Sequence, residues 1–230
     1  VAFLELGGLP SAEQQDKLIV SLQSHLGQSH SQAEEAAILG RWLVAESGAT
    51  LVHAFADPWV IEGQGSAGIE IAAQLAARGL PAPTRIVCPC GGAGLTAGLA
   101  LACPETEIVP VEPEGWDDVR LSLEAGDIVG VPDPAMPTAC DSLQTPATKP
   151  INFAVLKDRV PRVLVVSPAE VRTAQRWAFA NLRLVVEPGG AAGLAALLAG
   201  KVAADGQTVV VLSGGNTDAE AFAKVLATHD

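Results

Sequence analysis

The 230 residues are enough for one large domain or two small ones, and a hydrophobic fraction of 49% allows a sizeable core. Charged residues make up only 17%, too few for a disordered chain, and no apolar stretch is long enough to span a bilayer, which excludes an integral membrane protein. The 14 Lys+Arg residues against 26 Asp+Glu give a net charge of −12, which argues against a nucleic-acid partner.

The first elements in chain order are two amphipathic helices. Leucines recur every fourth position over 11–26, and a similar pattern with a Ser cap covers 31–47 and ends before Gly48. A short run of strand-forming residues follows at 50–55, and we then expect a helix over 66–78. This part of the chain is therefore mixed in character.

From residue 86 onward, short apolar runs alternate regularly with helical patterns. The predicted strands are 86–88, 107–111, 163–166 and 208–212. One predicted helix follows the first of these strands and ends near Ala102, and the next covers 117–125. A loop is predicted over 126–150. Two further helices run from the Ser167 cap to about Asn181 and, after the break at 187–190, to Leu198. Buried strands alternating with helices predict an α/β fold, a mostly parallel sheet with helices on both faces, whose ligands sit at the carboxyl ends of the strands.

The cysteines and the start of the chain suggest an ordinary intracellular protein. Cys88, Cys90, Cys103 and Cys140 lack the paired spacing of a zinc site, so we expect buried, reduced thiols. The chain starts at Val1 without a secretory pattern, and a cytoplasmic location is the expectation, alongside a truncated or processed start.

A glycine-rich turn follows the strand at 86–88. Gly91, Gly92, Ala93 and Gly94 precede a helix, and exposed amides at a helix N-terminus favour an anion, most often phosphate. A turn that only packs the helix on the strand is an equal alternative. A dinucleotide fingerprint is a third, but its glycine spacing here is one residue too long.

Two further strand ends carry polar residues. Four carboxylates lie within residues 112–118, where they form either a site for a hard cation or a solvated loop at a helix start. Ser213 follows the last strand, where its hydroxyl either meets a ring nitrogen in the cleft or caps a helix.

Taken together, these segments resemble the fold-type II pyridoxal-phosphate enzymes (the tryptophan synthase β-like fold), in the branch of serine/threonine dehydratases and serine racemase. The resemblance covers about residues 28–218. The matching segments, in the family's order, are 48–58, 63–66, 89–98, 112–113, 141–145, 187–192 and 213–216.

The resemblance implies roles for individual positions. The main chain of Gly91, Gly92, Ala93, Gly94 and Leu95 would hold the phosphate of pyridoxal 5'-phosphate. Ala93 replaces a usual glycine, which is tolerable if its dihedrals stay in the common region.

Two more roles follow from the same likeness. Ser213 would face the pyridine nitrogen, and a neutral hydroxyl there favours elimination over transamination. Mg²⁺ or Ca²⁺ would bind the Glu112 and Asp118 carboxylates and the Trp116 carbonyl.

The implied reaction is loss of water and ammonia from L-serine or L-threonine, giving a 2-keto acid. Racemase and hydroxyaspartate-lyase activities share these motifs, and a nicotinamide-nucleotide oxidoreductase is the remaining alternative. The family's Ser-aromatic-Lys-x-Arg-Gly and Ser-Ser-Gly-Asn-His segments do not occur here. This absence has three interpretations. The sequence is a fragment or lacks internal segments of its parent, the protein is a shortened relative, or it is a non-catalytic cofactor-binding protein. The first is the preferred interpretation.

The predicted domain organisation follows from those missing motifs. We expect 1–47 to be a remnant of an incomplete small domain and 48–230 to be the large cofactor-binding domain. The expected partner is a small amino-acid substrate, and family likeness alone suggests a homodimer.

Overall fold

The computed structural model describes residues 40, 42, 44–45, 47–132, 134–203 and 205–228. The chain divides into two compact units, residues 1–54 and 55–230, which are described separately. In the first unit, the described residues between 40 and 47 are helical, and this helix ends at Gly48, whose φ is +70°. This agrees with the predicted end of the 31–47 helix, whereas the predicted helix over 11–26 lies outside the described residues.

The second unit is built on a four-stranded sheet. Its strands are β1 (Arg85–Pro89), β2 (Glu107–Pro113), β3 (Leu164–Val166) and β4 (Thr208–Val210). They lie in the order β3-β2-β1-β4, and every pair is parallel, with Cys88 opposite Pro110 and Val87 opposite Val210. Each strand lies within or around an apolar run of the sequence, so the predicted parallel sheet is confirmed.

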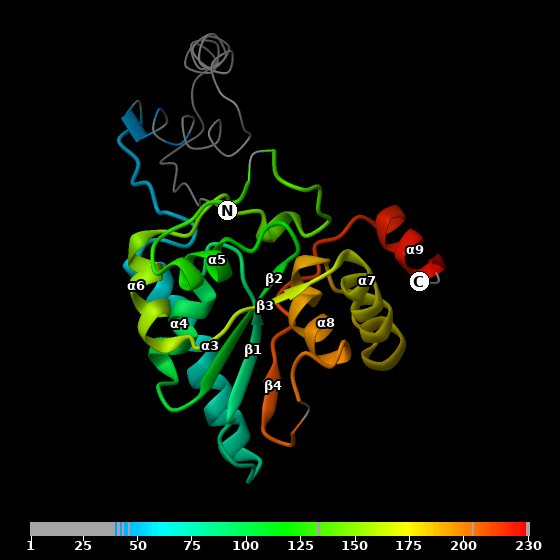
Figure 1. The fold of residues 1–230 in the computed structure, drawn as a ribbon. Coiled ribbons are helices and arrows are strands. Elements are labelled where there is room, and N and C mark those ends of the chain that lie inside the picture. Colours follow the sequence, from blue (N-terminus) through cyan, green and yellow to red (C-terminus); the bar gives the residue numbers. More distant parts are fainter. Residues whose placement is uncertain are drawn as a thin grey trace. The chain divides into compact units, whose positions relative to one another are not determined.

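Helices cover both faces of this sheet (Figure 1). They are α3 (Pro58–Ala77), α4 (Gly94–Ala102), α5 (Asp118–Ala125), α6 (Pro150–Arg159), α7 (Pro168–Trp177), α8 (Ala192–Leu198) and α9 (Ala219–Ala227). One face carries α3 to α6 and the other α7 and α8, while α9 lies beyond α7 and packs against it (Figure 1). The predicted capping box of α7 is present, with Ser167 and Glu170 bonding each other's main-chain amides. A π-helical turn (Ala178–Leu182) continues α7.

Among the described residues, the apolar core has three parts, one that includes α7 and α8 and two that include residues of α4. Val87, Val109 and Val111 belong to the part that includes α7 and α8, whereas Ile86 and Ile108 belong to one of the parts that include residues of α4. Alternate strand residues thus face opposite layers, as expected for a sheet buried on both sides.

Four elements differ from the sequence prediction. Helix α3 begins at Pro58, with Asp57 as its cap, eight residues earlier than predicted. A Cβ on Gly65 would lie 2.9 Å from the Gly98 carbonyl oxygen, so this glycine allows α3 to pack closely against α4 and does not mark a loop. Helices α6 and α9 were not predicted. Residues 50–55 form no strand, because no described strand pairs with them.

Candidate functional site

The glycine loop connects the end of β1 to the start of α4, at the carboxyl edge of the sheet. Gly91, Gly92, Ala93 and Gly94 are all buried. Among the residues that the structure describes, none accepts a hydrogen bond from the main-chain amides of residues 91–95, and the first helical bond of α4 is donated by Ala97 to Ala93. Five neighbouring donors at a helix N-terminus form a site suited to an anion.

Neighbouring segments leave no space for side chains on this loop. A Cβ on Gly91 would lie 3.1 Å from the Cα of Leu143, and one on Gly92 would overlap the ring of Phe55. A Cβ on Gly94 would lie 3.0 Å from the Cβ of Phe55. The loop is therefore a glycine cradle, defined as residues 91–95, in which only the main chain is available to a ligand.

The backbone of Ala93 lies outside the common region in which an alanine would replace a glycine without strain. Its φ is 70° and its ψ is 18°, which is the left-handed region, and it caps α4 without a side-chain hydrogen bond. That conformation costs an L-residue about 1–2 kcal/mol, so the surrounding structure must hold it in place.

Ser213 lies at the same edge, because it follows β4, which pairs with β1. Its side chain is exposed. The turn that it opens is held by Glu187, whose amide donates to the Gly214 carbonyl at 3.0 Å and whose Oε2 accepts from the Asn216 amide at 3.1 Å. The alternative role of Ser213 as a helix cap is wrong, because the next helix starts at Ala219 and is capped by Asp218.

The segments 141–145 and 187–190 join the two strand ends. A Cβ on Gly189 would contact the Ser142 hydroxyl, while Thr145 lies against Gly91. The topology thus brings together the matching segments 89–98, 141–145, 187–192 and 213–216, which are far apart in the sequence.

The acidic residues after β2 are arranged differently from one another. Glu112 is fully buried and accepts from the amides of Val119 at 3.0 Å and Arg120 at 2.9 Å, so it caps α5. Asp118 is also fully buried; its Oδ2 accepts from the Thr148 amide at 2.6 Å, and its Oδ1 has no hydrogen-bond partner among the described residues. These two residues therefore do not form the solvated loop that was the alternative interpretation.

Burial controls the acidity of this pair. It raises the pKa of Asp118 to about 7, against which the Thr148 amide works by stabilising the charged form. Burial and the nearby Asp118 charge raise the pKa of Glu112 well above its usual value. Two buried carboxylates next to each other are suited to a cation.

The predicted cation ligands differ in how they are presented. The Trp116 side chain is turned toward Met136, to whose carbonyl its Nε1 donates at 2.6 Å. In the described ranges, no three His, Cys, Asp or Glu side chains are gathered so as to hold a metal ion. The predicted ligand set has only two carboxylates beside one main-chain carbonyl. The absence of a three-residue cluster therefore does not test it, and it stays a prediction.

Two residues near the cradle were missed by sequence reasoning. The Thr148 hydroxyl donates to the Gly92 carbonyl at 3.3 Å, and the Asn152 Nδ2 donates to the Phe55 carbonyl at 2.8 Å. Thr148 and Asn152 lie more than fifty residues from their partners in sequence, so no local pattern could reveal these contacts.

The four cysteines are free thiols, and Cys88, Cys90 and Cys140 are buried as predicted, whereas Cys103 is partly exposed. Burial raises the pKa of Cys88 to about 12 and that of Cys140 to about 11, so both are poor nucleophiles at neutral pH.

A comparison with protein families identifies the fold and its cofactor class. The model for "pyridoxal-phosphate dependent enzyme" matches residues 12–214, which begins earlier than the predicted limit of residue 28. The chain belongs to this pyridoxal-phosphate-dependent family. Its fold is that of the fold-type II branch, and the family match favours pyridoxal phosphate over a dinucleotide as the cofactor.

Curated relatives of this family member are named for reactions of small amino acids. The chain is 37% identical to a β-hydroxyaspartate dehydratase of Paracoccus denitrificans, over 76% of this chain and 54% of the relative. It is 36% identical to an L-threonine ammonia-lyase of Geobacter sulfurreducens, over 87% of this chain and 48% of the relative. The chain thus spans about half the length of the curated relatives it matches.

Solved structures of the family share the same arrangement. A threonine deaminase from T.th. superposes with a TM-score of 0.74 at 39% identity, covering 83% of this chain and 62% of that one. Maize serine racemase gives a TM-score of 0.74 at 29% identity, covering 86% and 61%. Among the described residues, no helix combines the length and apolar character needed to cross a membrane.

Proposed function

We propose that the protein to which this chain belongs catalyses the pyridoxal-phosphate-dependent β-elimination of L-serine or L-threonine, releasing ammonia and a 2-keto acid. The observation that carries the proposal is the glycine cradle, in which five amides at the head of α4 lack a described acceptor. The relatives named as ammonia-lyases support the same reaction class.

The cradle fits the phosphate of the cofactor. Residues 91–95 offer main-chain donors only, and the close approach of Phe55 and Leu143 excludes side chains that would fill the space. We assign the phosphate to these amides and the pyridine nitrogen to the Ser213 hydroxyl. Pyridoxal phosphate, when bound, supplies the electron sink that makes the substrate α-proton acidic. Ser213, being neutral, does not force a proton onto the ring nitrogen, which favours elimination.

We assign the lysine that transfers the proton to a part of the complete gene product outside these 230 residues. The five lysines of these 230 residues are Lys17, Lys149, Lys157, Lys201 and Lys224, and none has the family's Schiff-base context. Lys201 is engaged with the Glu170 carboxylate and the Val165 carbonyl, both at 2.7 Å. We therefore assign cofactor binding to this chain and elimination to the whole protein.

A second candidate substrate is 3-hydroxyaspartate. It is favoured by the β-hydroxyaspartate dehydratase relative, whose identity of 37% is slightly above that of the threonine ammonia-lyase at 36%. Serine racemase relatives also support amino-acid racemisation as an alternative within the family. Initial rates of 2-keto acid release from L-serine, L-threonine and L-threo-3-hydroxyaspartate separate the substrates, and chiral analysis of recovered serine separates racemisation.

We also propose that Mg²⁺ or Ca²⁺ binds the carboxylates of Glu112 and Asp118 and the Trp116 carbonyl. The support is the buried Asp118 Oδ1, which has no hydrogen-bond partner among the described residues, in a pair whose pKa values are raised by burial. Either cation should raise the melting temperature of the wild type at pH 8 and leave that of Asp118→Asn unchanged. An equal rise in melting temperature in the two proteins would refute the proposed cation site.

We also propose that the domain boundary lies between residues 47 and 48, that the protein forms a homodimer, and that it is cytoplasmic. The dimer is tested by light scattering of the complete gene product, which should give twice the monomer mass.

The test of the proposed function uses the complete gene product with added pyridoxal phosphate. We expect a saturable visible absorption band and release of 2-keto acid from L-threonine or L-serine. Gly92→Ala should need at least about tenfold more pyridoxal phosphate for both, and Gly63→Ala, whose Cβ meets no atom within 4 Å, should keep both at the wild-type concentration. A folded wild type that shows neither the band nor any keto acid would refute the proposal.

A further inference from the structure

Thr148 connects the acidic pair to the glycine cradle. It lies just before α6 and is 1% exposed. Its amide donates to Asp118 Oδ2 at 2.6 Å, and its hydroxyl donates to the Gly92 carbonyl at 3.3 Å. The residue is thus fixed on its main-chain side and presents its hydroxyl to the loop.

The hydrogen bond to Gly92 constrains the next amide of the cradle. A peptide unit is planar and trans, so the carbonyl of Gly92 and the N–H of Ala93 point in opposite directions. Because Thr148 holds the carbonyl, it directs the Ala93 N–H away from itself. The orientation of one of the five cradle donors is therefore set by the Thr148 side chain, which binds the carbonyl of the same peptide unit.

The conformation of Ala93 makes this constraint necessary. Rotation of the Gly92–Ala93 peptide plane changes the ψ of Gly92 and the φ of Ala93 together, and it would release Ala93 from its φ of 70°. An alanine gains free energy by that release, whereas a glycine gains little. The observed loop therefore needs a partner for the Gly92 carbonyl.

We propose that Thr148 is a positioning residue that locks the Gly92–Ala93 peptide so that the Ala93 amide faces the cofactor phosphate. The inference rests on the proposed function of the cradle as the phosphate site. Thr148 acts only through the loop, and its hydroxyl, rather than its shape, carries the effect.

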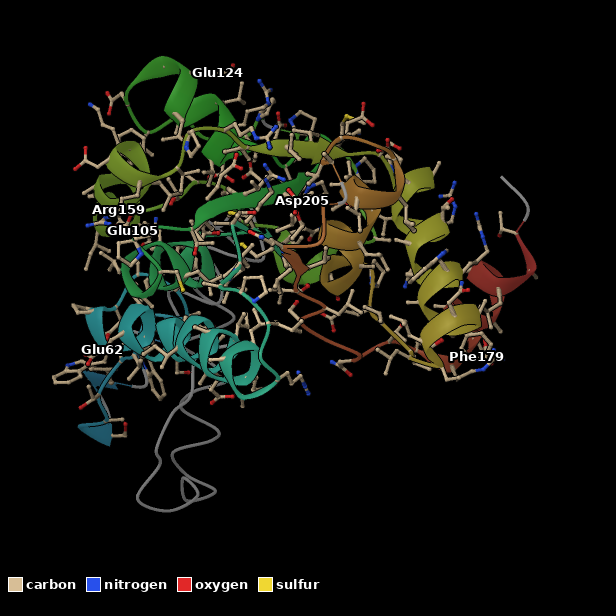
Figure 2. All side chains as sticks on the ribbon, turned by 90° about the horizontal axis from the view of Figure 1, so that it is seen from below. Glu62, Glu105, Glu124, Arg159, Phe179 and Asp205 are labelled. Carbon is tan, nitrogen blue, oxygen red and sulfur yellow. The ribbon has the colours of Figure 1, made fainter. Side chains whose placement is uncertain are left out.

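Three variants test this lock. Thr148→Val keeps the shape and loses the hydroxyl, while Thr148→Ser keeps the hydroxyl. Thr106→Val is the matched control, because the Thr106 hydroxyl donates to the Pro83 carbonyl at 3.0 Å. Thr106 precedes β2, at the amino ends of the strands, and lines a surface hollow together with Glu105 and Arg159. Figure 2 labels Glu105 and Arg159.

The readout is the dissociation constant of two probes, pyridoxal phosphate and unphosphorylated pyridoxal, measured by equilibrium dialysis. Thr148→Val should weaken pyridoxal phosphate about three- to tenfold, the effect of one hydrogen bond. Binding of pyridoxal should not change. Thr148→Ser should restore the wild-type constant, and Thr106→Val should leave it unaltered. Thr148→Ala gives the same comparison if the valine variant does not fold.

The outcomes distinguish this inference from the function on which it rests. If wild-type protein does not bind pyridoxal phosphate, the proposed function fails, and the lock fails with it. If the wild type binds and folded Thr148→Val binds equally well, only the lock is overturned. A serine variant as weak as the valine variant would also overturn it, because the side-chain shape would then be the cause.

Discussion

The ends of β1 and β2 are neighbours in the sheet, yet their polar groups are of opposite kinds. After β1, the amides of residues 91–95 are donors that have no described acceptor. After β2, the carboxylates of Glu112 and Asp118 are buried acceptors, and Asp118 keeps one oxygen without a partner among the described residues. Both groups are shielded from water, so each is costly unless it is paired.

This difference assigns each strand end to a different ligand class. A row of amides at a helix start stabilises negative charge, whereas buried carboxylates need a cation or a proton. Thr148 contacts both ends, with its amide on Asp118 and its hydroxyl on Gly92. The edge thus has an anion-binding half and an acidic half joined by one residue.

The largest expected effect concerns the acidic half and its dependence on pH. Burial raises the Asp118 pKa from 3.8 to about 7, so its contribution to stability is complete below about pH 4 and is lost as the pH rises to about 7. The shift corresponds to about 4 kcal/mol. Urea denaturation without divalent cations should therefore give a lower free energy of unfolding at pH 8 than at pH 5.

Asp118→Asn sharpens this prediction, because an amide keeps an acceptor for Thr148 and does not ionise. Its free energy of unfolding should change less between pH 5 and pH 8 than that of the wild type. An identical pH dependence in both proteins would contradict the burial argument.

The next effect concerns the anion-binding half. Gly92→Ala places a Cβ into the ring of Phe55, and overpacking of this kind costs about 1–3 kcal/mol. We expect that destabilisation and at least about a tenfold loss of pyridoxal phosphate affinity, since the strain falls on the cradle itself and about 1.4 kcal/mol corresponds to a factor of ten. Urea denaturation and dialysis measure the two effects. Unchanged affinity would place the phosphate elsewhere.

A smaller effect is expected at Ser213. Replacing it by alanine should weaken pyridoxal phosphate about threefold, for the loss of one exposed hydrogen bond, and should not alter the affinity for inorganic phosphate. The contrast between the two probes separates ring binding from phosphate binding. Equal losses for both probes would show that Ser213 does not face the ring.

The smallest effect is a control on α3. Gly63 lies inside this helix and a Cβ there meets no atom within 4 Å. Gly63→Ala should raise the free energy of unfolding by about 0.5–1 kcal/mol, because alanine loses less entropy in a helix. Thermal unfolding provides the measurement, and a destabilised variant would show that α3 packs differently.

The sequence predicts the layers of the fold better than it predicts their connections. The apolar strands and the Ser167 capping box are local signals, and the structure contains them. Helix α6 was missed because it follows a proline-rich loop and has no side-chain cap. The start of α3 was missed because Gly63 and Gly65 suggest a loop, although Gly65 serves close packing against α4.

The candidate site follows the same division. Parallel topology brings the strand ends together, so the glycine loop, Glu112 and Ser213 could be placed at one edge from sequence. The conformation of Ala93 could not be foreseen, because it depends on tertiary contacts. Thr148 and Asn152 act on residues 56 and 97 positions away, a separation at which no sequence pattern operates.

The most direct test of the central claim is an amide-resolved NMR titration of the protein with pyridoxal phosphate. If the cradle holds the phosphate, the amide proton resonances of residues 91–95 should move downfield together and saturate at one equivalent, as expected for N–H groups that gain a charged acceptor. Saturable binding that leaves those five amides unperturbed would contradict the account.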